Sequence, residues 1–147
     1  SYGPEMRGGT ANCHVIVSEH AIGSPIIAQD ATAVIVMNLP SLRKFESELA
    51  PQGILVSNAS LISAEPTRTD ITVIPIEANK VALELGADRS ANMVMLGAYL
   101  AASGLFTVDQ TAVALQNVFG PKKADLLPAN RAAMERGYEL VGDAVAR

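Results

Sequence analysis

The sequence predicts an α/β fold: a three-layer α/β/α sandwich around a mainly parallel sheet, with a helical carboxyl-terminal part. The first observation is that continuous apolar runs recur in the first half, at residues 31–37, 54–57 and 71–76. Runs of this kind are typical of strands in a buried parallel sheet. The second is that helical patterns separate these runs, and that only helical patterns follow residue 77. This order of elements is typical of Rossmann-like folds.

Length and composition are those of one domain, 1–147. A chain of 147 residues buries about two-thirds of the surface that it exposes when unfolded. Hydrophobic residues make up 49% of it but aromatic residues only 4%, so the core must consist of Ala, Val, Ile, Leu and Met. A mean hydropathy of +0.25 is high for a soluble monomer. It suggests that partner subunits cover part of the surface, although a buried parallel sheet also raises the value.

Charge and cysteine content exclude several classes of protein. The net charge of −4 and the absence of a basic stripe with interleaved aromatic residues argue against a nucleic-acid-binding protein. A single cysteine, Cys13, excludes a disulfide framework, and also an iron–sulfur cluster held by this chain alone, which needs about four thiolates. No signal peptide is visible, and the most apolar stretch, residues 91–105, is shorter than the roughly 20 residues of a membrane span. We expect a cytoplasmic protein without membrane contact.

Residues 11–18 alternate as a strand does. This alternation puts Cys13, Val15 and Val17 on one face, which predicts that Cys13 lies in the core. The other face carries Asn12, His14 and Ile16. No metal site is expected here, because Cys13 and His14 point to opposite faces. His14 is interpreted as a structural histidine, with a position facing a ligand as the alternative.

The elements of residues 31–76 follow from their local signals. Residues 31–37 and 54–57 are expected to be strands covered on both faces. Asn38 can cap a helix with Pro40 in its first turn, and Leu42, Phe45 and Leu49 then share one helix face. Residues 71–76 predict a third strand, which Pro75 places at an edge of the sheet or ends.

Four helices are predicted after residue 77. Residues 77–85 form a short helix closed by Gly86, and residues 91–103 are apolar on every side, as in a central or interface helix. Small residues give this second helix a face for close packing: Gly97, Ala98, Ala101 and Ala102. A capping box at Thr107 opens a helix over 108–119, which Gly120-Pro121 ends. The last helix, 127–145, has one apolar stripe: Leu127, Met134, Tyr138 and Val141.

The first ten residues form a glycine-rich loop. Gly3-Pro4 sets a turn, and Gly8-Gly9 allows close approach of the backbone to a ligand. Arg7 presents a donor fork suited to phosphate or carboxylate. The loop is one residue from a phosphate-binding P-loop, but Gly9 stands in place of the lysine and a strand follows instead of a helix, so a nucleotide triphosphatase is rejected.

Residues 1–13 as a whole, Ser1-Tyr2-Gly3-Pro4-Glu5-Met6-Arg7-Gly8-Gly9-Thr10-Ala11-Asn12-Cys13, resemble a known signature segment. It is that of the gamma subunit of 2-oxoacid:ferredoxin oxidoreductases, in the form typical of the 2-oxoglutarate branch. The resemblance continues, in the family's order, through Ile22-Gly23-Ser24-Pro25, Met37-Asn38-Leu39-Pro40-Ser41-Leu42, Asn58-Ala59-Ser60-Leu61 and Ala91-Asn92-Met93-Val94-Met95-Leu96-Gly97. Family members usually begin with a further strand, a Gly-Gly-Gln-Gly type loop and a helix. Nothing here corresponds to these, so the domain is expected to lack that unit.

The resemblance implies CoA-dependent oxidative decarboxylation of a 2-oxoacid to an acyl-CoA, carbon dioxide and reduced ferredoxin. It places thiamine diphosphate and the iron–sulfur clusters mainly in other subunits or domains, and it implies alpha and beta partner subunits, with a delta subunit as a further candidate. This chain would shape the site where coenzyme A enters, hold no metal and contribute no catalytic residue, so that it is inactive alone. The candidate cofactor-binding residues are Tyr2, Gly3, Arg7, Gly8, Gly9, Thr10, Asn38 and Asn58.

Two other functions remain open. The chain could be an autonomous phosphate-cofactor-binding module that uses the Arg7 loop, or a purely structural subunit whose loop only contacts a neighbour. Asn38 and Asn58 follow predicted strands, where ligands bind in open α/β sheets. Each also has a simpler interpretation, as a helix cap and a turn former respectively. The 2-oxoacid is open as well, since pyruvate, branched-chain and aryl-pyruvate enzymes have related gamma parts.

Overall fold

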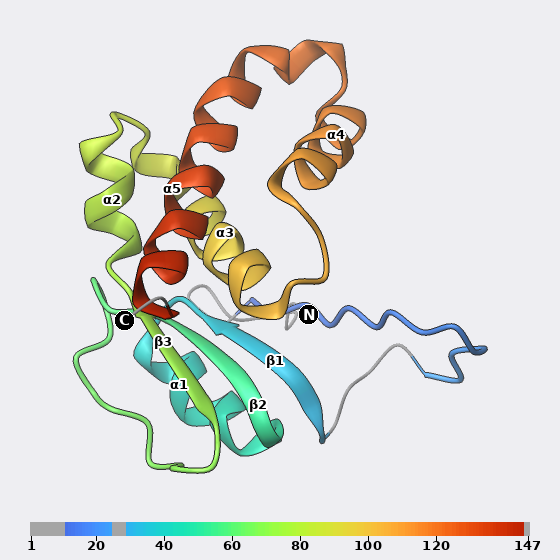
Figure 1. The fold of residues 1–147 in the computed structure, drawn as a ribbon, viewed down its shortest axis with the longest axis vertical. Helices are drawn as coiled ribbons and strands as arrows, with labels where there is room; N and C mark the ends of the chain where they lie inside the picture. The colour runs from blue at the N-terminus through green and yellow to red at the C-terminus, as the bar shows by residue number, and fades with distance from the viewer. Residues whose placement is uncertain (1–10, 25–28, 146–147) are drawn as a thin grey trace, which may run out of the picture.

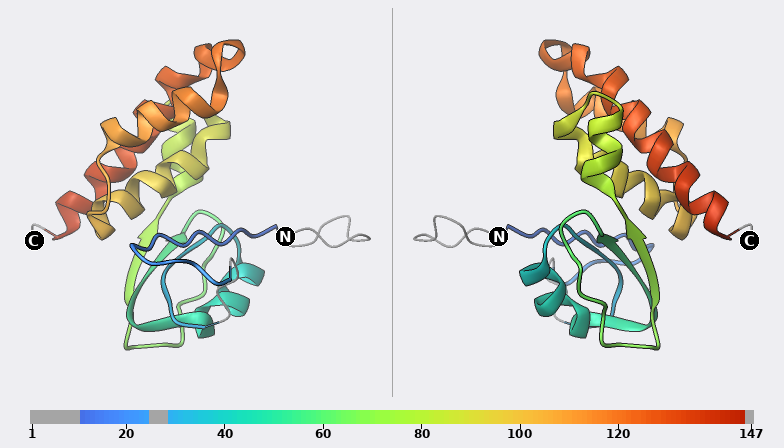
Figure 2. Two further views of the ribbon diagram at one scale, coloured as in Figure 1. Left: turned by 90° about the vertical axis from the view of Figure 1, so that its right-hand side faces the viewer. Right: turned by 90° about the vertical axis from the view of Figure 1, so that its left-hand side faces the viewer.

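The computed structural model describes residues 11–24 and 29–145, with side chains as far as Gly142. A sheet lies between two unequal layers of helices (Figure 1). The short helix α1 covers one face, while α2, α3 and α5 form a thicker layer over the other, as the two side views of Figure 2 show. The predicted three-layer α/β architecture is confirmed.

The sheet has three parallel strands in the order β1-β2-β3. Their bounds are β1 Ala31–Val36, β2 Leu49–Asn58 and β3 Thr72–Ile76. The register pairs Val36 with Ser57 and Asn58 with Ile76, and shifts once between Ala31 and Ala33. Pro75 lies in β3, an edge strand of the described sheet, where an unpaired backbone nitrogen is tolerated, as predicted.

The α1 side of the sheet has its own small core. Helix α1 spans Leu39–Phe45, and a 3₁₀ turn, Glu46–Glu48, continues it. The buried apolar residues on this side are Val36, Leu42, Leu49, Leu55 and Ile62. Burial of apolar surface therefore fixes α1 against β1 and β2 and closes this side of the sandwich.

The connection from β2 to β3 contains no helix, and a buried carboxylate holds it in place. Glu46 is 8% exposed, and its Oε1 accepts hydrogen bonds from the backbone N–H of Arg68 at 2.7 Å and from Thr67 Oγ1 at 3.0 Å. Arg68 in turn donates to the carbonyl oxygens of Glu46 and Leu49. These charge-assisted bonds substitute for the packing that a crossover helix would supply.

The thicker helical layer covers β2 and β3. It is formed by α2 (Ala78–Glu84), α3 (Ala91–Ser103) and α5 (Leu127–Val145). Its core is almost entirely aliphatic and contains Val56, Ile76, Ala78, Val81, Ala82, Ala91, Val94, Met95, Ala98, Ala133 and Val141. The prediction that the helix over 91–103 is central is therefore confirmed.

Helices α3 and α5 cross with their backbones in contact. A Cβ atom on Gly97 would lie 2.0 Å from the carbonyl oxygen of Met134, and one on Gly137 would lie 1.9 Å from that of Val94. Both distances are far shorter than any atomic contact allows, so each helix supplies the glycine that the other requires.

Helix α4 (Val108–Phe119) lies on the outside of this layer. The predicted capping box is present: Thr107 Oγ1 accepts from the backbone N–H of Gln110, whose side chain accepts from the backbone N–H of Thr107. No residue of α4 is buried. An ion pair between Asp109 and Arg131 links α4 to α5, and the 3₁₀ segment Pro121–Leu126 joins the two helices.

Four predictions are wrong, one about a segment and three about individual residues. Residues 11–18 run extended, with exposure alternating along the chain, but form no strand with the described part of the chain. The two faces are covered in the opposite way to that predicted. Cys13 is exposed, and the face with His14 and Ile16 is the half-buried one. Leu49 belongs to β2 and not to the preceding helix, and Tyr138 is 42% exposed and not buried along its helix.

Two further differences concern the extent of burial. Strand β2 is longer than predicted, because its first residue pairs with Ala31. Strand β1 is less covered than predicted: Ile35 is 39% exposed, since α3 and α5 lie over β2 and β3 instead. No helix within residues 11–24 and 29–145 has both the length and the apolarity needed to cross a membrane.

The helix crossing can be tested with three glycine-to-alanine variants. We expect Gly97→Ala and Gly137→Ala each to lower the free energy of unfolding by about 1–3 kcal/mol or more, because the added methyl group overlaps a backbone carbonyl. Gly142→Ala in α5 is the control: nothing lies within 4 Å of its added Cβ, and alanine favours helix by about 1 kcal/mol over glycine. Urea unfolding of the three variants measures the difference. Equal stabilities would contradict the close crossing.

Candidate functional site

The candidate site is the edge of the sheet where all three strands end. Because the strands are parallel and in register, their carboxyl ends lie along one edge, which is where ligands bind in open α/β folds. Asn38 is the second residue after β1, the loop after β2 begins directly after Asn58, and Glu77 leads from β3 into α2. Polar residues thus follow or end every strand at this edge.

Asn58 is fully buried, and both polar atoms of its side-chain amide form hydrogen bonds. Its side-chain Nδ2 donates to Asn79 Oδ1 at 2.7 Å, and its Oδ1 accepts from the backbone N–H of Ser60 at 3.2 Å. Its carbonyl oxygen also accepts from the backbone N–H groups of Leu61 and Ile62. The predicted role of Asn58 as a turn former is confirmed, and its amide additionally ties the β2 turn to α2.

A second link joins the same turn to the start of α2. Ser60 Oγ accepts from the backbone N–H of Lys80 at 3.4 Å. Lys80 Nζ donates to Glu77 Oε2 at 2.8 Å, and this hydrogen bond raises the pKa of Lys80 above its ordinary value. Lys80 is therefore a cation at every physiological pH, although Glu77 balances its charge.

Asn38 acts as the cap of α1. Its Oδ1 accepts from the backbone N–H of Ser41 at 2.9 Å, and its carbonyl oxygen accepts from that of Leu42. The simpler interpretation of Asn38 is thus confirmed, and its side chain is exposed at the carboxyl edge. The amide oxygen of Asn38 accepts the capping hydrogen bond, whereas its Nδ2 donor makes no hydrogen bond within the described residues.

The other candidate binding residues lie outside the described part of the chain: Tyr2, Gly3, Arg7, Gly8, Gly9 and Thr10. They remain predictions. Within the described part, no three His, Cys, Asp or Glu side chains are grouped so that they could hold a metal ion. The polar groups described at the carboxyl edge are amides, a hydroxyl and an ammonium paired with a carboxylate. These groups can orient a ligand through hydrogen bonds.

Sequence reasoning missed Asn79 and Lys80. Both lie in the first turn of α2, directly after the third strand, and the rule that nominated Asn38 and Asn58 applies to this position equally. The position of these two residues directly after a predicted strand was therefore the signal that could have identified them. The Asn58–Asn79 hydrogen bond itself could not be found in this way, because 21 residues separate its partners.

Comparison with known proteins shows the family. The model of the family described as pyruvate ferredoxin/flavodoxin oxidoreductase matches residues 1–140. The chain is similar to the ketoisovalerate oxidoreductase subunit VorA of Methanothermobacter thermautotrophicus, with 31% identity over 141 residues. That match covers 95% of this chain but only 28% of VorA. The 2-oxoglutarate synthase subunit KorC of the same organism is 28% identical over 147 residues, which cover 96% of this chain and 76% of KorC.

Solved structures show the same fold. The gamma subunit of the keto/oxoacid ferredoxin oxidoreductase of Geobacter sulfurreducens aligns with a TM-score of 0.68 at 21% identity, over 78% of this chain and 66% of that one. The 2-oxoglutarate:ferredoxin oxidoreductase of Magnetococcus marinus, solved with 2-oxoglutarate, coenzyme A and succinyl-CoA bound, aligns with a TM-score of 0.67 at 23% identity. It matches 86% of this chain, but this chain spans only 22% of it.

The Asn58–Asn79 hydrogen bond can be tested at its exposed partner. We expect Asn79→Ala to lower the free energy of unfolding by about 1–3 kcal/mol, because the buried Nδ2 of Asn58 loses its acceptor. Asn79→Asp keeps an acceptor oxygen and places a negative charge in the first turn of α2, where it is favourable. That variant should stay within about 0.5 kcal/mol of the parent. Urea unfolding separates the two, and equal losses would show that the acceptor does not matter.

Proposed function

The chain belongs to the pyruvate ferredoxin/flavodoxin oxidoreductase family, and on this premise we propose that it is the gamma subunit of a 2-oxoacid:ferredoxin oxidoreductase. The observation that carries the proposal is the family match over residues 1–140. The fold shared with the Geobacter sulfurreducens gamma subunit supports it.

We propose 2-oxoglutarate as the first candidate substrate of the assembled enzyme. KorC supports this choice, because this chain covers 76% of its length, so the two are similar in extent as well as in sequence. VorA is slightly more similar in sequence but is matched over 28% of its length. Its name makes a branched-chain 2-oxoacid, ketoisovalerate, the alternative substrate.

The proposed role of this chain is to complete the assembly and to help form the entrance for coenzyme A. Coenzyme A supplies the thiol that accepts the acyl group. The carboxyl edge offers Asn38 and Lys80 as donors for a ligand. Asn38 is held by its capping bond to Ser41, and the backbone of Lys80 is bonded to Ser60 in the turn that Asn58 forms. The group best suited to a phosphate remains Arg7, which lies outside the described residues. Thiamine diphosphate and iron–sulfur clusters are assigned to partner subunits, and ferredoxin to the complex as a whole.

A structural subunit is the second candidate function. The observation that favours it is the internal hydrogen bonding at the carboxyl edge: Asn58 is bonded to Asn79, the Asn38 oxygen caps α1, and Lys80 is paired with Glu77. Side chains that already bond within the chain have fewer donors and acceptors left for a ligand. In that case the Arg7 loop contacts only a neighbouring subunit. An autonomous phosphate-cofactor-binding module is the third candidate function. Binding of coenzyme A by the isolated chain would distinguish it from the other two.

The assignment is tested by comparing the isolated chain with the complex isolated from cells. The measurement is CoA-dependent reduction of a low-potential viologen with 2-oxoglutarate, ketoisovalerate and pyruvate. We expect no turnover by the isolated chain and turnover by the complex, with the highest kcat/KM for 2-oxoglutarate. Turnover by the isolated chain would overturn the proposed division of roles. A higher kcat/KM for ketoisovalerate would make ketoisovalerate the substrate in place of 2-oxoglutarate.

Arg7→Ala tests the proposed contact with coenzyme A. If Arg7 bonds a phosphate, its loss should raise the KM for coenzyme A roughly ten- to a hundredfold, which corresponds to about 1.5–3 kcal/mol for a charge-assisted hydrogen bond. The KM for the 2-oxoacid and the stability of the chain should stay unchanged. If Arg7 instead pairs with a partner's carboxylate, the subunit dissociation constant rises and the KM for coenzyme A does not. If neither changes, Arg7 is a solvated surface residue.

A further inference from the structure

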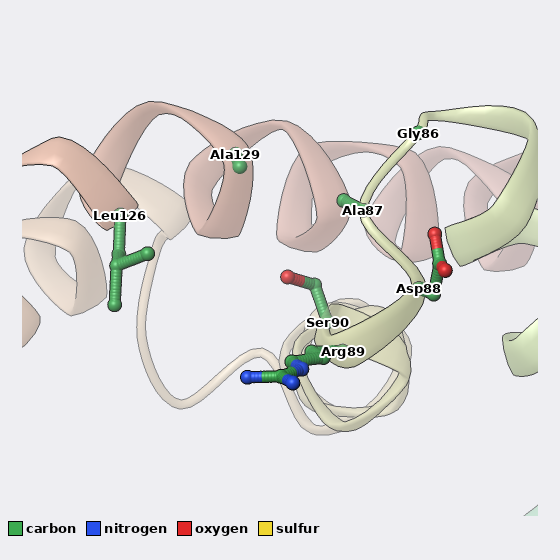
Figure 3. A pocket seen from close by; sticks show the side chains of 7 residues that line it. All are labelled: Gly86, Ala87, Asp88, Arg89, Ser90, Leu126 and Ala129. Carbon is green, nitrogen blue, oxygen red and sulfur yellow. The ribbon is translucent and has the colours of Figure 1, made fainter.

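A groove of about 340 Å³ lies in the helical layer between the loop that follows α2 and the start of α5. Its lining residues are Gly86, Ala87, Asp88, Arg89, Ser90, Leu126 and Ala129. Figure 3 shows Leu126 and Ala129 on one wall, with Ser90 and Arg89 on the other. This volume lies at the lower end of the range for ligand pockets.

One hydrogen bond between the two walls and one within the α5 side hold the groove in shape. Ser90 is 7% exposed, and its hydroxyl donates to Asn130 Oδ1 at 3.1 Å. Asn130 Nδ2 then donates to the carbonyl oxygen of Leu126 at 2.9 Å. The same three residues thus connect the loop before α3 to the first turns of α5. A surface that is shaped before it meets a partner pays less ordering entropy on binding.

The groove carries a cation that has no anionic partner within the described residues. Among the described arginines, Arg68, Arg131 and Arg136 form ion pairs. Arg89 forms none with a described residue, and neither does Arg43, which lies on the other side of the sheet. In Figure 3 the Arg89 guanidinium and the Asp88 carboxylate point toward opposite ends of the groove. A guanidinium in this position offers a fork of donors to a carboxylate brought by another molecule.

One exposed leucine, Leu126, lines the same groove as Arg89. Leu126 in the groove wall is 46% exposed, and Leu83 and Leu85, just before Gly86, are 66% and 42% exposed. Isolated exposed leucines are common on protein surfaces. Here Leu126 shares a groove with Arg89, and apolar and arginine side chains are both found in protein interfaces, where arginine is enriched.

We propose that this groove is a docking surface for another subunit of the complex. The partner segment that fits it places an apolar side chain between Leu126 and Ala129 and a carboxylate on Arg89. Charge complementarity selects this occupant, and the proposal rests on the proposed function, because it takes the chain to be part of a larger assembly.

Charge reversal in the complex tests the proposed ion pair. We expect Arg89→Glu to raise the dissociation constant between this chain and the other subunits at least tenfold. Arg43→Glu is the matched control: it makes the same charge change at an exposed residue of α1, on the other side of the sheet, which forms no ion pair within the described residues. It should leave the dissociation constant within twofold. Thermal unfolding of both free variants confirms that each is folded.

Thiol labelling tests the surface without altering its charge. In a Cys13→Ser background, Ala129→Cys should react with a maleimide at least tenfold more slowly in the complex than in the free chain. Ser47→Cys, at an exposed position beside α1, gives the labelling rate on the other side of the sheet. Equal rates at position 129 in the free chain and the complex would overturn the docking surface while leaving the proposed function intact.

Two other outcomes have distinct meanings. Protection of position 129 that rises with the concentration of the free chain would place a second copy of this chain in the groove, and would contradict the proposal. Failure of the parent chain to associate with any oxidoreductase subunit would overturn the proposed function, and the docking surface with it.

Discussion

The fold depends on two helices that touch backbone to backbone. Gly97 of α3 lies against the carbonyl group of Met134, and Gly137 of α5 lies against that of Val94. A Cβ atom at either glycine would force the helices apart, because it would lie 2.0 Å or 1.9 Å from a carbonyl oxygen of the other helix. The chain has few aromatic residues to fill its interior. Because the two backbones approach closely, small aliphatic side chains are sufficient to fill the core over β2 and β3 at the high density of protein interiors.

Other features of the molecule follow from this crossing. It fixes the direction of α5, so that Asn130 in its first turns reaches the Ser90 hydroxyl at the start of α3 and shapes the groove. In the sheet, buried polar groups lie where they can form hydrogen bonds. The amide of Asn58 donates to Asn79, and the carboxylate of Glu46 accepts from the loop between β2 and β3. Rigid internal bonding of this kind suits a subunit whose proposed role is to present surfaces to its partners.

Much of the secondary structure could be predicted from the sequence. The helices at 91–103, 108–119 and 127–145 have the predicted bounds, because apolar periodicity and local signals such as the Thr107 capping box act within a few residues. The parallel sheet followed from the alternation of strands and helices. The topological rule also selected Asn38 and Asn58 correctly as residues of the carboxyl edge, together with their capping and turn roles.

Exposure and long-range pairing were decided only in the tertiary structure. The period-two pattern of residues 11–18 separates two faces but does not say which one is covered, and Cys13 lies on the uncovered face. Leu49 fits a helix face in sequence, yet strand pairing with Ala31 draws it into β2. The bond between Asn58 and Asn79 and the contacts of Gly97 likewise join distant parts of the chain. A sequence determines local backbone preferences, whereas burial and partner choice depend on which surfaces the whole chain brings together.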